Sequence, residues 1–252
     1  MKSKFLSLQT IALALLLMIF FAECKKDEKD PVKSSSGVTP HELLAGDKYD
    51  KLDVEIQFVQ GSEPTQATLD NLKTFLEQRL NKPGGITIVQ NSISSPGKSS
   101  YSVDDIESIE KSNRTQVTSG GTVSTYFLFL DGEYAGNSGS GKVLGIAYGA
   151  TSMAIFEKTV KENSGSLGKP STTMLESTVI NHEFGHILGL VNNGTSMQSA
   201  HQDGTNGRHC SNKDCLMYYT AETTDIIANI LTGGIPGLDA NCISDLKANG
   251  GK

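Results

Sequence analysis

The sequence carries little positive charge and no internal repeat. Its 252 residues include 22 lysines and arginines against 28 aspartates and glutamates, which gives a formal net charge of −6 and a pI near 5.4. Proteins that bind nucleic acids or anionic lipid head groups use basic surfaces to neutralise phosphates. The composition therefore argues against both kinds of partner.

Two common catalytic motifs are also missing. The serine hydrolase pattern G-x-S-x-G does not occur. The segment GNSGSGKV, Gly136 to Val143, comes close to the phosphate-binding pattern G-x-x-x-x-G-K-[ST], but Val143 stands where a hydroxyl would hold magnesium. The following VLGIAYGAT is typical of a strand, whereas a phosphate-binding loop opens a helix. We therefore interpret the segment as a flexible glycine-rich turn.

The N-terminus has the pattern of an export signal. Lys2 and Lys4 precede an apolar run from about Ile11 to Ala22. This run is short for a membrane span and has the length of a signal-peptide core. We expect residues 1–23 to be a signal peptide and the protein to be exported.

Cys24 directly follows this segment and resembles the acylated cysteine of a bacterial lipobox, although Glu23 stands where a small residue is usual. An ordinary signal peptide cut nearby is the alternative. The charged stretch KKDEKDPVKSSSG cannot bury enough apolar surface to fold. We expect residues 24–48 to be a lipidated cysteine and a disordered tether, and this anchor to be the sole membrane contact. The charged run resembles surface-export signals and favours the outer membrane or cell surface.

The pattern of residues 49–252 predicts a folded domain of α/β (α+β) class. The segments KLDVEIQFVQG, ITIVQNSI, STYFLFLDG and KVLGIAYGATSMAIFE have strand patterns, and the last should include an edge strand within VLGIAYGAT. Helical spacing occurs in TLDNLKTFLEQRLNKPGG and SVDDIESIEKSN. This order predicts helices packed on a twisted mixed sheet.

One further helix should carry the chemistry. Thr173 precedes Glu176 by three residues, which predicts a capping box at the helix start, and Gly189 is placed to end it. We expect residues 49–189 to form an upper subdomain. Residues 190–252, with a short helix, a glycine-proline break and a closing helix, should form a smaller, mostly helical lower subdomain.

The candidate metal ligands lie on this helix in the pattern H-E-x-x-H. His182 and His186 are four residues apart, so both imidazoles project from one helix face and can meet one zinc ion. Glu183 lies beside the first histidine and could act as base on a water held by the metal. A catalytic zinc takes three protein ligands, so a third remains to be found.

The extended motif HEFGHILGL resembles the metzincin metalloproteases, whose third histidine follows three residues after the glycine. Asn192 stands there in this sequence. The segment CLMYY resembles the methionine turn of that clan, with Met217 beneath the metal, and HCSNKDCLM resembles the archaemetzincin form of the motif. The resemblance implies that residues 190–208 are an insertion and that His209 is the third ligand.

Alternatives stay open for the third ligand, since a long loop could also bring back His201 or, less readily, Asp203. The resemblance further suggests that Tyr219, two residues after the methionine, helps to hold the oxyanion. A tyrosine merely packed under the helix is the alternative. The expected metzincin-like catalytic domain would bind one catalytic zinc ion.

Three cysteines remain in the body of the chain. Cys210 and Cys215 are close enough in sequence to close a small disulfide loop, which leaves Cys242 without a partner. Archaemetzincins have a later C-x-x-C pair that helps to bind a second, structural zinc. Because Cys242 stands alone, we expect no second metal.

These features predict a monomeric zinc-dependent peptidase acting on peptides or proteins, with an endopeptidase favoured. An aminopeptidase-type exopeptidase is one alternative. A catalytically inactive, peptide-binding surface lipoprotein is another: Asn192 in the place of the usual histidine favours it, and the intact Glu183 argues against it.

Overall fold

A twisted, mostly parallel sheet is the centre of the fold. The computed structural model describes residues 37–138 and 141–252. The predicted signal peptide and Cys24 lie outside the described residues. The strand order is β2-β1-β4-β7-β6, with β6 antiparallel to β7 and every other neighbouring pair parallel. The strands are β1 (Lys51–Val59), β2 (Gly85–Ile93), β4 (Thr122–Leu130), β6 (Gly145–Ala147) and β7 (Ser152–Phe156).

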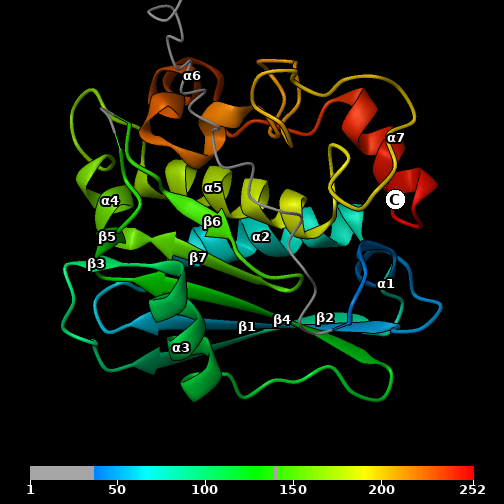
Figure 1. Ribbon diagram of the computed structural model, residues 1–252, viewed down its shortest axis with the longest axis horizontal. Coiled ribbons are helices and arrows are strands. Elements are labelled where there is room, and N and C mark those ends of the chain that lie inside the picture. The colour runs from blue at the N-terminus through cyan, green and yellow to red at the C-terminus, as the bar shows by residue number, and fades with distance from the viewer. Residues whose placement is uncertain (1–36, 139–140) are drawn as a thin grey trace, which may run out of the picture.

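Helices cover both faces of this sheet (Figure 1). On one face lie α2 (Gln66–Arg79) and α5 (Thr172–Ile187), and on the other lies α3 (Val103–Asn113). The alternation of β4 shows the division: Phe127 and Phe129 belong to the core beneath α5, whereas Tyr126, Leu128 and Leu130 belong to the core that includes Ile106 of α3. A strand covered on both faces is apolar almost throughout, as STYFLFL is. The α/β prediction with a mixed sheet is confirmed.

The domain begins earlier than the sequence suggested. A short helix, α1 (Pro40–Leu44), follows a capping box at Thr39. Val38, Leu43 and Leu44 are buried in the main core, and the His41 ring hydrogen-bonds the Asn249 carbonyl at 2.9 Å. The predicted tether therefore ends before residue 38. Three large apolar side chains within VTPHELLAG, residues 38–46, are too few for a periodicity signal but enough to dock a single helical turn.

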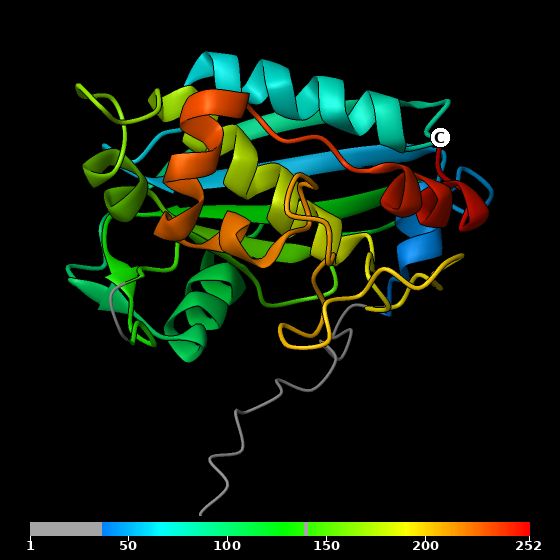
Figure 2. The same cartoon turned by 90° about the horizontal axis from the view of Figure 1, so that it is seen from above.

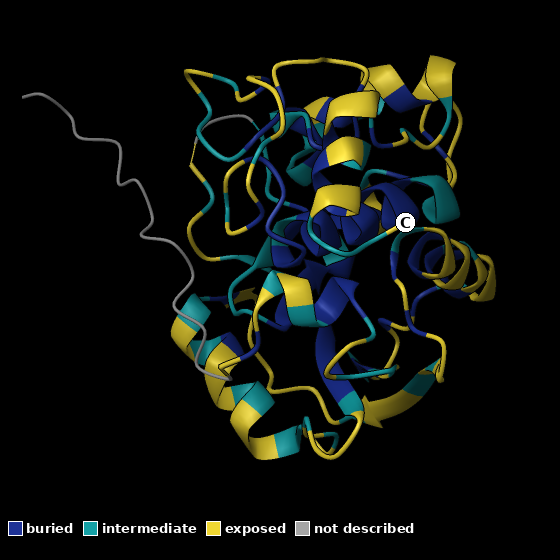
Figure 3. Cartoon of the chain, turned by 90° about the vertical axis from the view of Figure 1, so that its right-hand side faces the viewer, coloured by how far each residue is buried: buried dark blue, intermediate teal, exposed yellow. Residues whose placement is uncertain are grey.

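The C-terminal part of the chain lies over α5 (Figure 2). It contains two 3-10 helices, η1 (Tyr219–Glu222) and η2 (Thr224–Ile226), then α6 (Ile227–Gly233) and α7 (Ala240–Ala248). The smaller elements are α4 (Glu157–Glu162) and a two-stranded sheet of β3 (Ser100–Tyr101) and β5 (Glu133–Tyr134). Figure 3 shows buried residues gathered in the interior, with exposed turns around them. Across residues 37–138 and 141–252, no helix combines the length and apolar character that crossing a membrane requires.

Candidate metal centre

The helix that carries the histidines starts two residues before the predicted cap. Ser171 is the N-cap of α5, and its hydroxyl accepts a hydrogen bond from the Met174 backbone N–H at 3.2 Å. The expected capping box at Thr173 and Glu176 is wrong. Glu176 is fully buried and points at the start of α2, where it accepts a hydrogen bond from the Thr65 backbone N–H at 3.1 Å. Packing against α2 outweighs the local capping pattern.

The end of α5 follows the prediction. Gly189 has φ +74°, the left-handed conformation that glycine adopts at little cost. Its N–H donates to the His186 carbonyl at 3.0 Å, and the Leu190 N–H donates to the Gly185 carbonyl at 3.1 Å. This pair of bonds is a Schellman cap. Asn192 then also has positive φ, +62°, so the chain turns sharply where metzincins place the third histidine.

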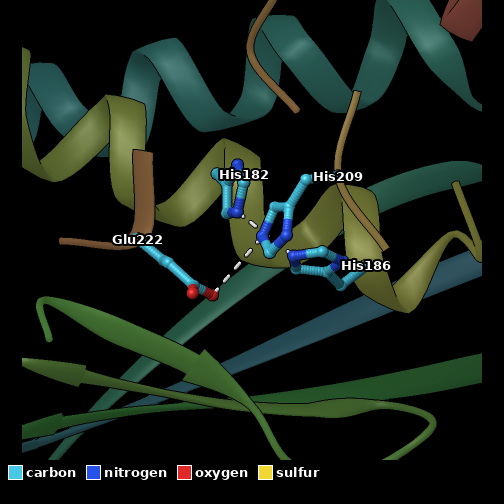
Figure 4. Close-up of side chains that lie close together, drawn as sticks. All are labelled: His182, His186, His209 and Glu222. Atoms are coloured by element: carbon cyan, nitrogen blue, oxygen red, sulfur yellow. Dashed lines mark hydrogen bonds and ion pairs between the residues drawn. The ribbon is translucent and has the colours of Figure 1, made fainter. Parts of the chain in front are cut away.

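Three histidines meet beside α5 (Figure 4). The Nε2 atoms of His182 and His186 are 3.1 Å apart. The His209 ring stacks on that of His182, with centroids 5.4 Å apart, and lies edge-on to that of His186, with centroids 5.0 Å apart. One ring nitrogen from each histidine and a carboxylate oxygen of Glu222 all lie within 4.8 Å of one another. The structure thus places His209, and not His201, with the two helical histidines.

Backbone carbonyls fix the orientation of two of these rings. The Nδ1 of His182 lies 2.7 Å from the Leu216 carbonyl oxygen, and the Nδ1 of His209 lies 2.7 Å from the Asn206 carbonyl oxygen. A carbonyl only accepts hydrogen bonds, so each Nδ1 carries the proton and each Nε2 offers a lone pair to the shared space. Tetrahedral zinc with Zn–N bonds of 2.0–2.1 Å sets its ligand atoms about 3.3 Å apart. The 3.1 Å between two Nε2 atoms fits this donor set.

Burial keeps two of the imidazoles neutral. Desolvation, reinforced by the neighbouring His209, lowers the pKa of His182 to about 4, and desolvation lowers the pKa of His186 well below its ordinary value. Burial also acts to lower the pKa of His209, but its ion pair with Glu222, Nε2 to Oε2 at 3.6 Å, raises that pKa overall. Metal ligation requires neutral imidazoles, so His182 and His186 are in the binding form at neutral pH.

Met217 packs directly under the active-site helix, as the methionine-turn resemblance implies. A β-carbon built on Gly185 would lie 2.3 Å from the Met217 sulfur, so the sulfur fills the space that this glycine leaves. Both Met217 and Leu216 are fully buried. Contact between the turn and the helix brings the Leu216 carbonyl to His182.

The alternative third ligands lie elsewhere. His201 is buried next to Asp245, with its Nε2 2.7 Å from Oδ2. Asp203 instead accepts hydrogen bonds from the backbone N–H groups of Thr205 and Asn206, at 2.8 and 3.1 Å. Within an otherwise irregular loop, a small antiparallel pairing of residues 201–203 with 209–211 carries His209 toward α5.

The predicted disulfide between Cys210 and Cys215 is wrong. Both thiols are free and buried, as is that of Cys242. The Cys210 sulfur lies 3.4 Å from Nδ1 of His201, and the Cys215 sulfur lies 3.7 Å from that of Cys242. Proximity in sequence suggested a pair, but the fold gives the two cysteines different neighbours. His201 of the 190–208 segment lies next to Cys210, and Cys242 of α7 lies next to Cys215.

Comparison with known proteins agrees with this geometry. No protein-family model and no curated protein sequence matches the chain. Among solved structures, the crystal structure of an archaemetzincin from Methanopyrus kandleri is similar, with a TM-score of 0.52 and 13% sequence identity over 79% of this chain and 96% of that one. The chain has the archaemetzincin fold. At this identity the likeness supports the fold, and the site has to be argued from the chain's own residues.

In this archaemetzincin fold, Glu222 is a site residue that sequence reasoning missed. It ends η1 and directs its carboxylate toward His209 (Figure 4). Its place three residues after Tyr219 gave no local signal, because a glutamate in a helical turn is ordinary. The ring of Tyr219 contacts that of Tyr218 in a tilted arrangement, with centroids 4.6 Å apart. Its role at the oxyanion stays a prediction.

The side chain of Glu183 extends from α5 toward β6, the edge strand of the sheet. Its side chain is 1% exposed, and a β-carbon built on Gly145 of β6 would lie 3.0 Å from its Cγ. The same β-carbon would lie 2.6 Å from Val179 Cγ1. The glycine therefore lets the helix approach the edge strand closely, and it brings Glu183 next to β6.

Proposed function

We propose that the chain is a zinc-dependent peptidase, with internal peptide bonds as its substrates. One observation carries the proposal: three imidazoles with lone pairs facing one space lie on and beside the helix that also carries Glu183. The fold is shared with an archaemetzincin, which supports the same chemistry. We propose one catalytic zinc ion, bound by His182, His186 and His209.

The residues divide the work between binding and proton transfer. Bound zinc lowers the pKa of a water toward about 7 and polarises a carbonyl beside it. Glu183 takes the proton that the attacking water loses and delivers it to the departing amine. The Leu216 and Asn206 carbonyls hold their histidines in the tautomer that presents Nε2. Tyr219 is proposed to reach the oxyanion.

The edge strand offers a place for an extended substrate. β6 is the last strand of the sheet and pairs only with β7 among the strands described. A peptide can add to such an edge through main-chain hydrogen bonds, which tolerate many sequences. Gly145 of this strand adjoins Glu183, so a peptide bound along β6 passes the proposed base.

We further propose that the protein is exported, acylated at Cys24 and held as a monomer at the outer membrane or cell surface. The N-terminal pattern described above supports this. The test is metabolic labelling with a fatty-acid analogue, in which Cys24→Ser should abolish the label. A labelled Cys24→Ser protein would refute acylation at this residue.

Peptidase activity is tested with the full chain loaded with zinc and a mixed-peptide library. Glu183→Gln should lower the cleavage rate about 10²–10⁴-fold, the usual contribution of a general base, while keeping its zinc. His41→Ala, which changes an exposed histidine away from the site, is the matched control. Fragment masses distinguish internal cleavage from stepwise trimming by an aminopeptidase. Zinc bound without any cleavage would instead favour the peptide-binding alternative.

A further inference from the structure

A short segment after the methionine turn, residues 222–224, lies against the edge of the sheet. The Leu144 backbone N–H donates to the Glu222 carbonyl at 2.8 Å, and Thr223 forms an antiparallel bridge with Val143. Val143 and Leu144 directly precede the edge strand β6. Main-chain pairing of this kind is how an extended peptide adds to a sheet edge. The chain's own segment thus takes the positions next to the proposed substrate path.

Thr224 strengthens this pairing through its backbone and its side chain. Its N–H donates to the Lys142 carbonyl at 2.9 Å, and its Oγ1 accepts a hydrogen bond from the Lys142 N–H at 3.1 Å. Within the partner segment, Asn137 Oδ1 accepts a hydrogen bond from the Val143 N–H at 2.9 Å. These bonds fix the backbone position from which the Glu222 side chain extends.

The Glu222 carboxylate points at the three imidazoles (Figure 4). Its Oε2 lies 3.6 Å from Nε2 of His209, and one of its oxygens lies within 4.8 Å of a ring nitrogen of both His182 and His186. A tetrahedral zinc ion with bonds of about 2.0–2.2 Å sets its ligand atoms about 3.3–3.5 Å apart. The carboxylate therefore lies close to the place of a fourth ligand.

Exposure separates Glu222 from the histidines. Its side chain is 35% exposed, against 11% for that of His209. An exposed carboxylate can turn into solvent without leaving an unpaired buried charge. By contrast, backbone carbonyls hold the rings of His182 and His209 in place. Glu222 can therefore leave a metal ion without disturbing the rest of the site.

We propose that Glu222 is a displaceable fourth ligand of the metal at the three histidines, an inference that rests on the proposed function. The pairing with residues 142–144 holds the carboxylate there until water and substrate take its place, and the backbone of the segment stays bound. A catalytic zinc ion usually keeps this position for water. The same pairing bounds the substrate path, because a peptide can add along Gly145–Ala147 whereas Val143 and Leu144 are already paired.

The test uses the Co²⁺-substituted full chain, whose visible spectrum reports the ligands and whose azide affinity reports an open coordination position. Metal content is measured first and compared with that of His209→Ala, which identifies the ion at the histidines. Glu222→Gln should change the spectrum before azide is added and should bind azide about tenfold more tightly or more. A position filled nine-tenths of the time by a protein ligand weakens the apparent affinity by about that factor.

Two comparisons separate ligation from other effects of Glu222. Glutamine has the size of glutamate, but its amide oxygen suits Ca²⁺ or Mg²⁺ and not a zinc-like ion. Glu222→Gln and Glu222→Ala should therefore behave alike, whereas glutamine would behave like the wild type if Glu222 merely blocked access. Asp225→Asn removes an exposed negative charge from the neighbouring η2 and should leave both the spectrum and the azide affinity unchanged.

Thr224→Pro tests the role of the pairing. Proline has no N–H, so the hydrogen bond to the Lys142 carbonyl is lost. The substitution suits the backbone, because residue 224 begins η2 and Thr223 before it is extended, with φ −130° and ψ 167°. This variant should bind azide with an affinity between those of the wild type and Glu222→Gln.

The possible failures are distinguishable. Identical spectra and equal azide affinity in the wild type and Glu222→Gln would overturn ligation by Glu222 and leave the proposed function intact. A Thr224→Pro protein with the wild-type affinity would overturn the role of the pairing. A wild type without metal at the three histidines under metal-replete conditions would refute the proposed function, and this inference with it.

Discussion

The close contact between Gly185 of α5 and Met217 predicts an unusual effect of a glycine-to-alanine change on stability. Gly185→Ala should destabilise the protein although alanine is the better helix former. In a helix interior the change from glycine to alanine contributes about 1 kcal/mol in favour of folding. Here the added methyl would lie 2.3 Å from the Met217 sulfur and 3.1 Å from its Cε, well inside van der Waals contact.

The magnitude follows from opposing the two effects. Overpacking a buried site costs about 1–3 kcal/mol, and a separation of 2.3 Å places this site at about 2–3 kcal/mol. After the gain of about 1 kcal/mol in helix propensity, Gly185→Ala should lower the free energy of unfolding by about 1–2 kcal/mol. In a Met217→Ala background the clash is gone, and the same change should raise stability by up to about 1 kcal/mol. The sign of the effect should therefore reverse between the two backgrounds, with a coupling of about 2–3 kcal/mol.

Denaturant unfolding of the four proteins in the double-mutant cycle measures this coupling. Each should be measured with and without zinc, because a displaced Leu216 carbonyl would also weaken the orientation of His182. A Gly185→Ala protein more stable than the wild type, or additive effects in the double variant, would show that Met217 moves aside freely. Met217 would then not determine the distance between α5 and the methionine turn.

Other changes test neighbouring parts of the structure. Burial, with Glu176 nearby, raises the pKa of Glu157 to about 9. The stability from its protonated form is therefore complete below about pH 4.5 and lost as the pH rises to 9. Glu157→Gln should remove this slope and be more stable than the wild type at pH 8 by about 5 kcal/mol in urea unfolding, at about 1.4 kcal/mol for each pH unit above the unfolded pKa; a wild type with flat stability would contradict this. Gly145→Ala should push Val179 and α5 away from β6, because the added methyl would lie 2.6 Å from Val179 Cγ1. We expect kcat/KM to fall about 10–100-fold, with zinc retained. Unchanged kinetics would show that substrate does not bind along β6. Ser171→Ala should cost about 1 kcal/mol of stability through loss of the α5 cap, seen as a lower denaturation midpoint. An unchanged midpoint would show that packing alone fixes the helix start.

Local patterns in the sequence predicted those parts of the structure that local physics decides. The Gly189 end of α5 depends on one residue's backbone freedom, and the strands follow from side-chain alternation. The start of α5 was mispredicted because Glu176 is drawn to Thr65, more than 100 residues away in sequence. Likewise, the docking of Leu43 and Leu44 depends on a core that the remainder of the chain builds.

The residues of the candidate site also differ in how far local sequence patterns predicted them. His182, Glu183 and His186 could be recognised from spacing alone. The choice of His209 over His201 needed a family resemblance, since a long loop can deliver either residue. The position of Glu222 and the contact between Cys215 and Cys242 depend on segments that are distant in sequence, and residue spacing predicted neither. An odd number of cysteines was the one available hint.

His209 and Cys210 are consecutive, yet one faces the three-histidine group and the other faces the thiols. Closing a flexible loop of 19 residues, the length of the 190–208 segment, costs about 3 kcal/mol of chain entropy. When Cys210 is held among the other cysteines, that entropy is already lost, and His209 arrives at α5 without a further conformational search. The histidine site should therefore assemble faster, and release its metal more slowly, once Cys210 has formed its contact with His201.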